Sequence, residues 1–219
     1  MLTLFGTLDS GNVYKAQLIL ARVGADYRRV DVAQTRNEPR DPRFLAVNPM
    51  GKVPVVLRED GHVISESGAI LYHFAGSSDL WSKDRDTTTE ILRWMFFEQY
   101  SHEPALAVMR YLRHFTDHPD RHAGRFAELE PQARRALGVM EPRLSGHDWL
   151  AAEGCTIADF ALYPYTHTAG SVGFDVSRFP GTERWLERVE SQPRFVPFGY
   201  EGAVETLSFA EYFGSEPEE

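Results

Sequence analysis

The chain has a single cysteine, Cys155, among its 219 residues. An intrachain disulfide needs two cysteines, and so does a two-cysteine redox motif, so the sequence excludes both. It also excludes a cysteine-based metal cluster, and any thiol chemistry therefore has to use a thiol from another molecule. We expect Cys155 to be a small buried apolar group rather than a nucleophile.

Runs of basic residues and long apolar stretches are also missing. The 32 acidic and 23 basic side chains give a formal net charge of -9, and no cluster of lysine and arginine is long enough to follow a phosphate backbone. We therefore expect no nucleic-acid partner. No apolar stretch approaches the roughly 20 residues of a membrane span, and no signal-peptide pattern precedes the first strand, so we predict a cytoplasmic protein that does not contact a membrane.

The first third of the chain alternates strand and helix patterns. Residues 2–5 are a short apolar strand, and residues 12–24 have helical spacing with Gly24 placed as a C-cap. Residues 27–32 alternate like a strand, which gives a βαβ opening with a parallel pair of strands. A hairpin and a helix over residues 67–74 follow, so the predicted order is βαβ followed by ββα.

The hairpin is predicted by two apolar runs, residues 53–57 and 63–64, on either side of Asp60-Gly61. Pro54 has no backbone N–H, which restricts it to the start or the edge of a strand. Val53 is therefore expected to keep free backbone groups. An extended peptide can bind to such groups, although a hairpin that merely begins with a proline is the alternative.

The composition changes after residue 78. Residues 79–86 are polar, and no convincing strand alternation follows them. Helical spacing of apolar residues takes its place. We predict an α/β domain over residues 1–78 and an all-α domain over residues 87–219, joined by residues 79–86 as a linker.

Two prolines interrupt the helical patterns of the second domain. Pro104 lies between patterns at residues 91–96 and 106–115 and predicts a kink there. Pro131 lies inside a pattern over residues 123–144, and one explanation is that a new helix begins at this proline. Both prolines therefore mark places where we expect a helix to bend or to begin.

The sharpest local signal in the second domain is Cys155-Thr-Ile-Ala-Asp-Phe160. Thr156 is placed to cap a helix and Asp159 to bond back to the cap, which resembles a capping box, and Cys155 and Phe160 have the spacing of a hydrophobic staple. We interpret Asp159 as a helix-nucleating residue rather than an acid. Loss of the cap is expected to cost about 0.5 to 2 kcal/mol.

Four segments follow one another in a recognisable order, namely Ser10-Gly-Asn-Val-Tyr-Lys15, Asn48-Pro-Met-Gly-Lys-Val-Pro54, Glu66-Ser67 and Thr156-Ile-Ala-Asp159. Together they resemble the cytosolic glutathione S-transferases, and the resemblance covers nearly the whole chain. No cysteine lies in the stretch between the first strand and the first turns of the first helix, so the similarity is to bacterial serine- or asparagine-type members rather than to cysteine-type members. The resemblance implies a thioredoxin-like N-terminal domain, an all-helical C-terminal domain, a homodimer and a role in detoxification.

The resemblance also implies which residues meet glutathione. In this family the acidic residue of the Glu66-Ser67 pair meets the γ-glutamyl ammonium group, and the serine meets the γ-glutamyl carboxylate at a helix N-terminus. Val53, before a cis bond to Pro54, pairs with the cysteinyl backbone, and Lys52 approaches the glycyl end. Glutathione is thus the expected co-substrate.

Other interpretations of these residues stay open. Ser67 is also a good helix cap, and Lys52 is also an ordinary solvated charge. The glycyl carboxylate has further candidates among which the spacing does not select: Arg36, Arg40 and Arg43.

The glutathione thiol has to ionise before it attacks. A thiol with a pKa of ~8.5 is only about 3% thiolate at pH 7, and a pKa lowered by about two units costs the site ~2.7 kcal/mol. Donors at the start of the first helix can supply this stabilisation. Ser10 matches the serine of the serine-type classes, and Asn12 matches an asparagine that some bacterial classes use; both are also good helix caps, whereas Tyr14 is expected to be a packing residue.

The electrophile pocket is expected between the domains. An arginine there would stabilise developing negative charge, although an arginine on an amphipathic helix is usually solvated. His102 with Glu103 is too little for a metal site, and we predict no metal. The residues expected near the pocket are Tyr100, His102, Arg110 and Tyr111, with Tyr163 and His167 as further candidates.

The leading prediction is a glutathione transferase that activates the thiolate through Ser10 and Asn12 and directs it at a hydrophobic electrophile. A glutathione-dependent disulfide or peroxide reductase would use the same site, and Asn12 favours it. The third possibility is a non-catalytic binding or interaction module, because function does not follow from fold. We expect the homodimer interface near the aromatic-rich first helix of the second domain.

Overall fold

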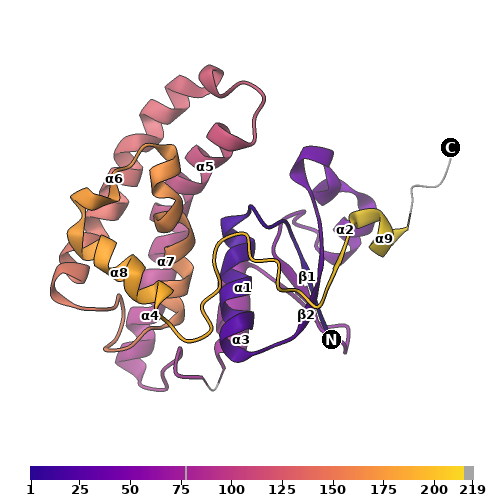
Figure 1. Ribbon diagram of the computed structural model, residues 1–219, viewed down its shortest axis with the longest axis horizontal. Helices are drawn as coiled ribbons and strands as arrows, with labels where there is room; N and C mark the ends of the chain where they lie inside the picture. Colours follow the sequence, from indigo (N-terminus) through magenta and orange to yellow (C-terminus); the bar gives the residue numbers. More distant parts are fainter. Residues whose placement is uncertain (77, 215–219) are drawn as a thin grey trace. The chain divides into compact units, whose positions relative to one another are not determined.

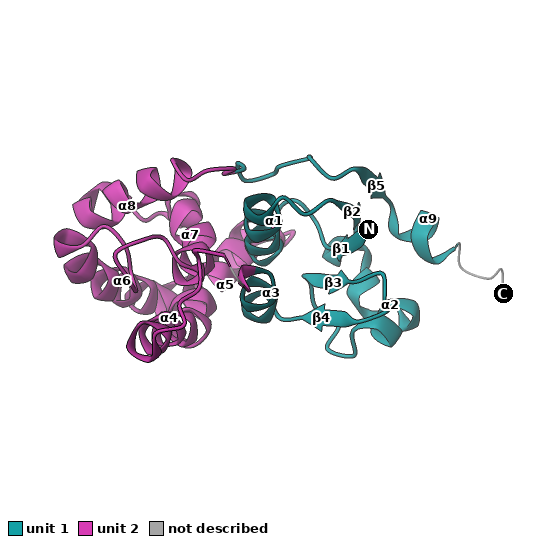
Figure 2. Ribbon diagram, turned by 90° about the horizontal axis from the view of Figure 1, so that it is seen from below, with its two compact units in different colours: residues 1–74, 196–219 teal, residues 75–195 magenta. Residues whose placement is uncertain are grey.

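Two compact units make up the protein in the computed structural model, which describes residues 1–76 and 78–214. Unit 1 combines Met1–Phe74 with the C-terminal segment that begins at Val196, and unit 2 is Ala75–Phe195 (Figure 2). The predicted domain ranges differ from these units at the C-terminal end, because residues 196–214 belong with the N-terminal unit. Residues 215–219 of the predicted helical domain lie outside the described residues.

Unit 1 is built on a mixed sheet of five strands in the order β4-β3-β1-β2-β5. β1 pairs in parallel with β2 and antiparallel with β3, β3 pairs antiparallel with β4, and β2 pairs in parallel with β5. The predicted βαβ-ββα order is confirmed. The elements, which Figure 1 shows, are β1 (Leu2–Phe5), α1 (Gly11–Val23), β2 (Tyr27–Val30), α2 (Pro42–Val47), β3 (Val55–Leu57), β4 (Val63–Ser65), α3 (Ser67–Ala75), β5 (Glu205–Leu207) and α9 (Phe209–Phe213).

Helices cover both faces of this sheet. α1 and α3 lie on one face, and α2 and α9 lie on the other (Figure 2). The second face holds an apolar core to which the strands, α2 and α9 all contribute: Phe5, Val30, Val32, Phe44, Val55 and Phe209. A sheet buried on both faces has a fixed register, so the loops at its ends are held in place.

α1 has the ends that the sequence predicts. Ser10 is its N-cap, with φ -86° and ψ 120°, and Gly24 adopts the left-handed conformation at φ 68° as the C-cap. Its inner face is packed with buried apolar side chains, among them Leu18, Ile19 and Leu20. The N-terminus of α1 is therefore fixed by the core below it.

The described residues of unit 2 form helices and connecting loops and contain no strand. Its long helices are α4 (Arg85–Phe97), α5 (Glu103–His114), α6 (Ala123–Gly146), α7 (Ile157–His167) and α8 (Pro180–Glu190), with a π-helical segment η3 (Glu98–His102) between α4 and α5. Asp84 caps α4 by accepting from the Thr87 amide over 2.8 Å, so the last two residues of the predicted linker, 85 and 86, already belong to α4.

The predictions made for Pro104 and Pro131 in unit 2 have different outcomes. Pro104 follows the π-helical segment and lies in the first turn of α5, where a missing N–H costs little; the helix type changes there, and the kink at Pro104 stays a prediction. The suggestion that a helix begins at Pro131 is wrong, because α6 runs continuously past it. Pro131 is exposed while residues such as Leu137 and Met140 are buried, so water can satisfy the freed carbonyl and tertiary packing keeps the helix together.

The capping box at Thr156 and Asp159 is confirmed. The Asp159 carboxylate accepts from the Thr156 amide at 2.8 Å, from Trp185 Nε1 at 2.9 Å and from the Leu150 amide at 3.1 Å. Burial raises the pKa of this carboxyl group, while the donors around it favour the ionised form. Asp159 therefore joins α7, α8 and the loop before α7, and it has the structural role that we predicted.

Candidate functional site

The register of the sheet brings three loops of unit 1 to one end. Phe5, the last residue of β1, stands opposite Val55 at the start of β3, and Val55 stands opposite Ser65 at the end of β4. The segments 6–10, 53–54 and 66–67 therefore leave the sheet side by side. These segments contain most of the residues that the sequence motifs single out.

Ser10 places a hydroxyl group at the N-terminus of α1. Its Oγ accepts from the Val13 amide over 3.3 Å, which is the capping geometry. A hydroxyl oxygen that accepts one hydrogen bond still carries its own proton, so Ser10 can also donate to an anion. The first turn of α1 has no acidic residue, and its positive dipole end is not offset within the helix.

Asn12 and Ser67 join the N-termini of α1 and α3. The Ser67 hydroxyl donates to Asn12 Oδ1 over 3.3 Å, and Ser67 is only 5% exposed. Two helix N-termini thus lie beside each other, each with amide groups and a positive dipole end. This pairing makes the end of the sheet suitable for an anionic ligand.

Glu66 stands at the turn from β4 into α3 with φ 68°, in the left-handed region. This conformation typically costs a residue other than glycine about 1 to 3 kcal/mol. The Glu66 carbonyl is turned toward the first turn of α3, where it accepts from the Ile70 amide at 3.0 Å. The exposed carboxylate is held next to Ser67 by a conformation that packing has to maintain.

The loop before β3 has the features that the proline predicts. The Val53-Pro54 bond is cis, Pro54 is buried, and both residues precede the first ladder pair of β3. The Asn48 side chain donates to the Lys52 carbonyl over 2.8 Å and so shapes this loop. Sequence reasoning missed this role of Asn48, which caps the C-terminus of α2, although an asparagine before a turn is a recognisable signal.

Two of the three candidate arginines form ion pairs with nearby carboxylates. Arg36 pairs with Glu38 at 2.6 Å, and Arg43 pairs with Asp41 at 2.7 Å. The bond from Arg43 lowers the pKa of Asp41. Arg40 is exposed and has no ion pair with any residue that the structure describes, so it is the arginine most available to a ligand carboxylate.

The residues predicted for an electrophile pocket do not gather within unit 2. His102 is fully buried and lies 2.9 Å from the Thr166 hydroxyl, whereas Tyr100 is 88% exposed. Arg110 and Tyr111 both contact Phe115. A cavity of about 560 Å³ in this unit has other residues on its lining, among them Met109, Arg113, Phe126 and Phe174.

Tyr163 and His167 belong to a hydrogen-bonded cluster with Glu190. The Tyr163 hydroxyl lies 3.1 Å from His167 Nδ1 and donates to Glu190 Oε1 over 2.9 Å. Burial lowers the pKa of His167, and Glu190 opposes this shift. The cluster ties α7 to α8 within unit 2.

No group of three or more histidine, cysteine, aspartate or glutamate side chains in the described residues could hold a metal ion. Within the same part of the chain, no helix is long and apolar enough to cross a membrane.

The chain matches two models of the glutathione S-transferase family, the N-terminal domain over residues 1–76 and the C-terminal domain over residues 100–193. The crystal structure of a glutathione S-transferase from Pseudomonas fluorescens is 41% identical with a TM-score of 0.87, and the match covers 90% of this chain and 98% of that chain. The fold is therefore a thioredoxin-like domain with an all-helical domain, as predicted. The chain belongs to the glutathione S-transferase family.

Relatives of this chain include proteins that are named for different functions. The disulfide-bond oxidoreductase YfcG of Escherichia coli is 28% identical over 83% of this chain and 87% of its own length. The transcriptional regulator URE2 of Saccharomyces cerevisiae is 25% identical over 89% of this chain, and the chain spans about two thirds (66%) of that protein. A structure of Ure2p in complex with glutathione is 27% identical with a TM-score of 0.79, covering 88% of this chain and 95% of that chain.

Proposed function

We propose that this protein is a cytoplasmic glutathione transferase that binds glutathione in unit 1. The observation that carries the proposal is the hydrogen bond from Ser67 to Asn12, which joins two helix N-termini beside the cis Val53-Pro54 loop. Glutathione is an extended peptide with two carboxylates, and this site offers main-chain groups before a strand together with amide groups at two helix ends. The chemistry of the donors therefore fits the ligand.

Each part of glutathione has a suitable partner. The exposed Glu66 carboxylate complements the γ-glutamyl ammonium group, and the start of α3 with Ser67 complements the γ-glutamyl carboxylate. The backbone of Val53 pairs with the cysteinyl residue. Lys52 and Arg40, both exposed, are the cations proposed for the glycyl carboxylate.

The thiolate is stabilised at the N-terminus of α1. Ser10 donates its hydroxyl proton to the sulfur while its oxygen keeps the cap bond from the Val13 amide. Asn12, in the first turn of the same helix, contributes a second polar group, and the helix dipole favours the anion. The activated sulfur then attacks a hydrophobic electrophile and forms a thioether as the leaving group departs.

A second reaction on the same site is glutathione-dependent reduction of a disulfide or a peroxide. The position of Asn12 against Ser67 favours it, because a side-chain amide can hold a thiolate without supplying a proton to it. In disulfide reduction the thiolate attacks one sulfur and expels the other as a thiolate. A second glutathione then releases glutathione disulfide.

A non-catalytic role is the third possibility, and homodimer formation is a separate proposal. The name of URE2 as a transcriptional regulator motivates the non-catalytic role. The homodimer is supported by Phe96 and Tyr100, which are 68% and 88% exposed one helical turn apart in α4 and η3. Large exposed aromatic side chains at this spacing are typical of a protein contact surface.

Calorimetric titration separates the three functions. Reduced glutathione and glutathione disulfide are titrated separately into the purified protein at low salt and neutral pH, and products are then identified with an aryl halide and with a small disulfide. Binding of reduced glutathione with a thioether product supports the transferase. Tight binding of the disulfide, with glutathione disulfide as the product, supports the reductase. Binding of neither ligand contradicts both enzymes and favours the interaction module.

A further inference from the structure

Residues 196–214, here called the C-terminal clasp, lie beyond both family models, which match residues 1–76 and 100–193. They nevertheless form part of unit 1. The clasp contains β5 and α9 and contacts elements on both faces of the sheet. The clasp therefore contacts unit 1 from outside the residues that the family models match.

The first part of the clasp is hydrogen-bonded to α1. The Tyr14 hydroxyl donates to the Val196 carbonyl over 2.6 Å, and Gln17 Nε2 donates to the Tyr200 carbonyl over 2.8 Å. Tyr14 and Gln17 are buried side chains of the helix whose N-terminus carries Ser10. The clasp is therefore fixed to α1 before it reaches the edge of the sheet.

The middle of the clasp covers that edge. β5 pairs with β2, and the Asp31 amide just beyond β2 donates to the Leu207 carbonyl over 2.9 Å. The chain then enters α9, where Ser208 and Glu211 form a capping box. This capping box stabilises a helix of only five residues, which would not persist alone.

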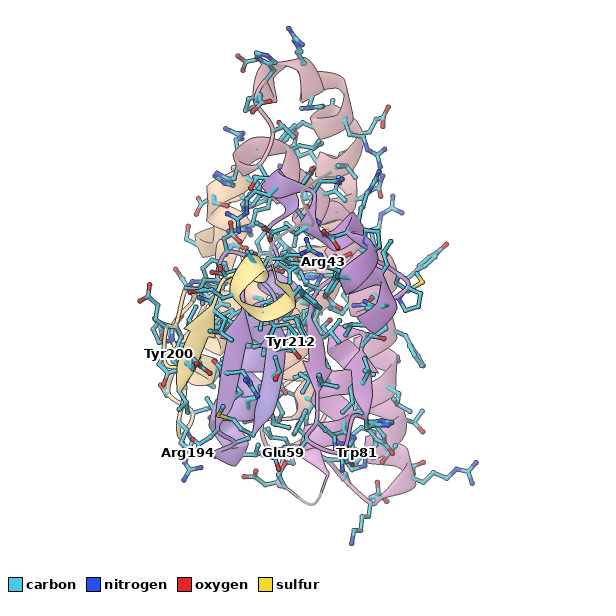
Figure 3. All side chains as sticks on the ribbon, turned by 90° about the vertical axis from the view of Figure 1, so that its right-hand side faces the viewer. Arg43, Glu59, Trp81, Arg194, Tyr200 and Tyr212 are labelled. Atoms are coloured by element: carbon cyan, nitrogen blue, oxygen red, sulfur yellow. The ribbon has the colours of Figure 1, made fainter. Side chains whose placement is uncertain are left out.

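α9 contacts α2 and the end of β1. Phe209 is 4% exposed in the core that also contains Phe44 of α2, and Tyr212 packs edge-on against Phe5 at 5.2 Å between ring centroids. Arg43 of α2 donates to the Gly214 carbonyl over 2.6 Å and lies 5.0 Å from the centre of the Phe209 ring. Figure 3 shows Arg43 beside the yellow helix α9, to which Tyr212 belongs.

α2 is in turn connected to the loop before β3. Asn48 ends α2, and its side chain donates to the Lys52 carbonyl. Gly51 approaches the Pro39 carbonyl so closely that a Cβ atom would lie 2.8 Å from it. The position of α2 therefore sets the position of Lys52 and of the turn around Arg40.

We propose that the C-terminal clasp is a positioning element for the glycyl end of glutathione: α9 holds α2 in place, and α2 holds the loop that carries Lys52. The inference rests on the proposed function. The γ-glutamyl end meets Glu66 and Ser67 at the start of α3, which the α9 contacts do not reach directly. Loosening α9 therefore weakens recognition of the glycine residue selectively.

The test uses the full chain with Ser208→Ala and Glu211→Ala, two exposed positions whose replacement removes the capping box and leaves the core residues unchanged. The control is Asp84→Ala, which uncaps an exposed helix end in unit 2. Calorimetry compares glutathione with γ-glutamylcysteine, which has no glycine. The clasp variant is expected to bind glutathione about five- to tenfold more weakly and to keep its affinity for γ-glutamylcysteine, because ordering of the glycyl-binding loop is lost.

Amide hydrogen exchange gives a second readout that needs no ligand. The clasp variant should exchange faster than the wild type over Pro42–Val47, and the Asp84→Ala control should not. Unchanged exchange in α2, or equal weakening of both peptides, overturns the proposal. If the wild type binds neither peptide, the proposed function fails while the exchange experiment still decides whether α9 holds α2.

Discussion

The Ser67 hydroxyl donates to Asn12 Oδ1 over 3.3 Å and thereby joins the first turns of α1 and α3. The two residues are 55 positions apart in the chain, so their contact depends on the register of β1, β3 and β4. Each helix start is a weak anion site on its own. In the proposed function, the two helix starts lie side by side to receive the γ-glutamyl carboxylate and the thiolate of a single glutathione molecule.

Replacement of Ser10 tests its chemical role apart from its capping role. Ser10→Ala should lower kcat/KM by about 10- to 100-fold, because a hydrogen bond to an ionised sulfur is lost. It should also cost about 1 kcal/mol of stability through the lost cap. Ser10→Asp keeps a good cap but places a carboxylate near the thiolate, so it should be stable and inactive. An active Ser10→Asp enzyme would contradict donation from this position.

Replacement of Glu66 by glycine is expected to stabilise the protein and to weaken glutathione binding. Glu66→Gly should raise the free energy of unfolding by about 0.5 to 1 kcal/mol, because glycine accepts the left-handed conformation without strain. It should weaken glutathione binding by about tenfold or more through loss of the charge. Glu66→Gln keeps the strain and removes the charge, so it should weaken binding without added stability. Urea unfolding and calorimetry measure the two effects, and unchanged binding in both variants would remove Glu66 from the site.

The exposed aromatic pair tests the proposed homodimer. Phe96→Asp together with Tyr100→Asp should convert a dimer into a monomer, because each new carboxylate would have to be buried at the contact. The control is Tyr72→Asp, an exposed aromatic residue of α3 in unit 1. Light scattering after size exclusion gives the mass of each variant. A wild-type monomer, or a dimer that survives both substitutions, would disprove a contact at these residues.

Much of the fold can be predicted from local patterns. The strand at Leu2–Phe5, the helix ending at Gly24 and the capping box at Asp159 each have a short-range signal that matches the tertiary structure. β5 has none, since it is three residues long and exists because β2 offers an unpaired edge. Pro131 fails as a signal for the opposite reason, because the buried face of α6 outweighs a local preference.

The candidate site residues are predicted from sequence motifs more than from geometry. Ser10, Pro54 and Ser67 fall where the motifs place them, because each motif lies next to a strand end. The left-handed conformation of Glu66 cannot be predicted from the sequence, because residues other than glycine rarely adopt a positive φ and a glutamate gives no indication of it. The residues expected on the electrophile pocket stay a prediction; Tyr100 and His102 are only two positions apart, yet one is exposed and the other buried, because such positions point to different faces of a helix.

Asp159 is the buried carboxylate on which the α7–α8 region depends. Asp159→Asn replaces an acceptor oxygen by an amide that faces the Thr156 and Trp185 donors, so the free energy of unfolding should fall by about 2 to 4 kcal/mol. Thr156→Ser keeps the cap and should change it by less than about 1 kcal/mol. Chemical denaturation measures both variants. A stable Asp159→Asn protein would show that the carboxylate is already protonated and donating.

His167 makes the stability of the protein depend on pH. Burial lowers its pKa in the folded state, so the unfolded chain binds the proton more readily and stability falls as the pH drops below the ordinary histidine value of about 6.5. His167→Gln should reduce the loss of stability between about pH 7.5 and about pH 5. The dependence should not vanish, because burial and Arg58 also lower the pKa of His73. The control is the exposed His118→Gln, and urea midpoints at both pH values give the comparison. An equal slope in His167→Gln and the wild type would assign the effect to other groups, and a steeper slope would mean that Glu190 stabilises the imidazolium more than burial opposes it.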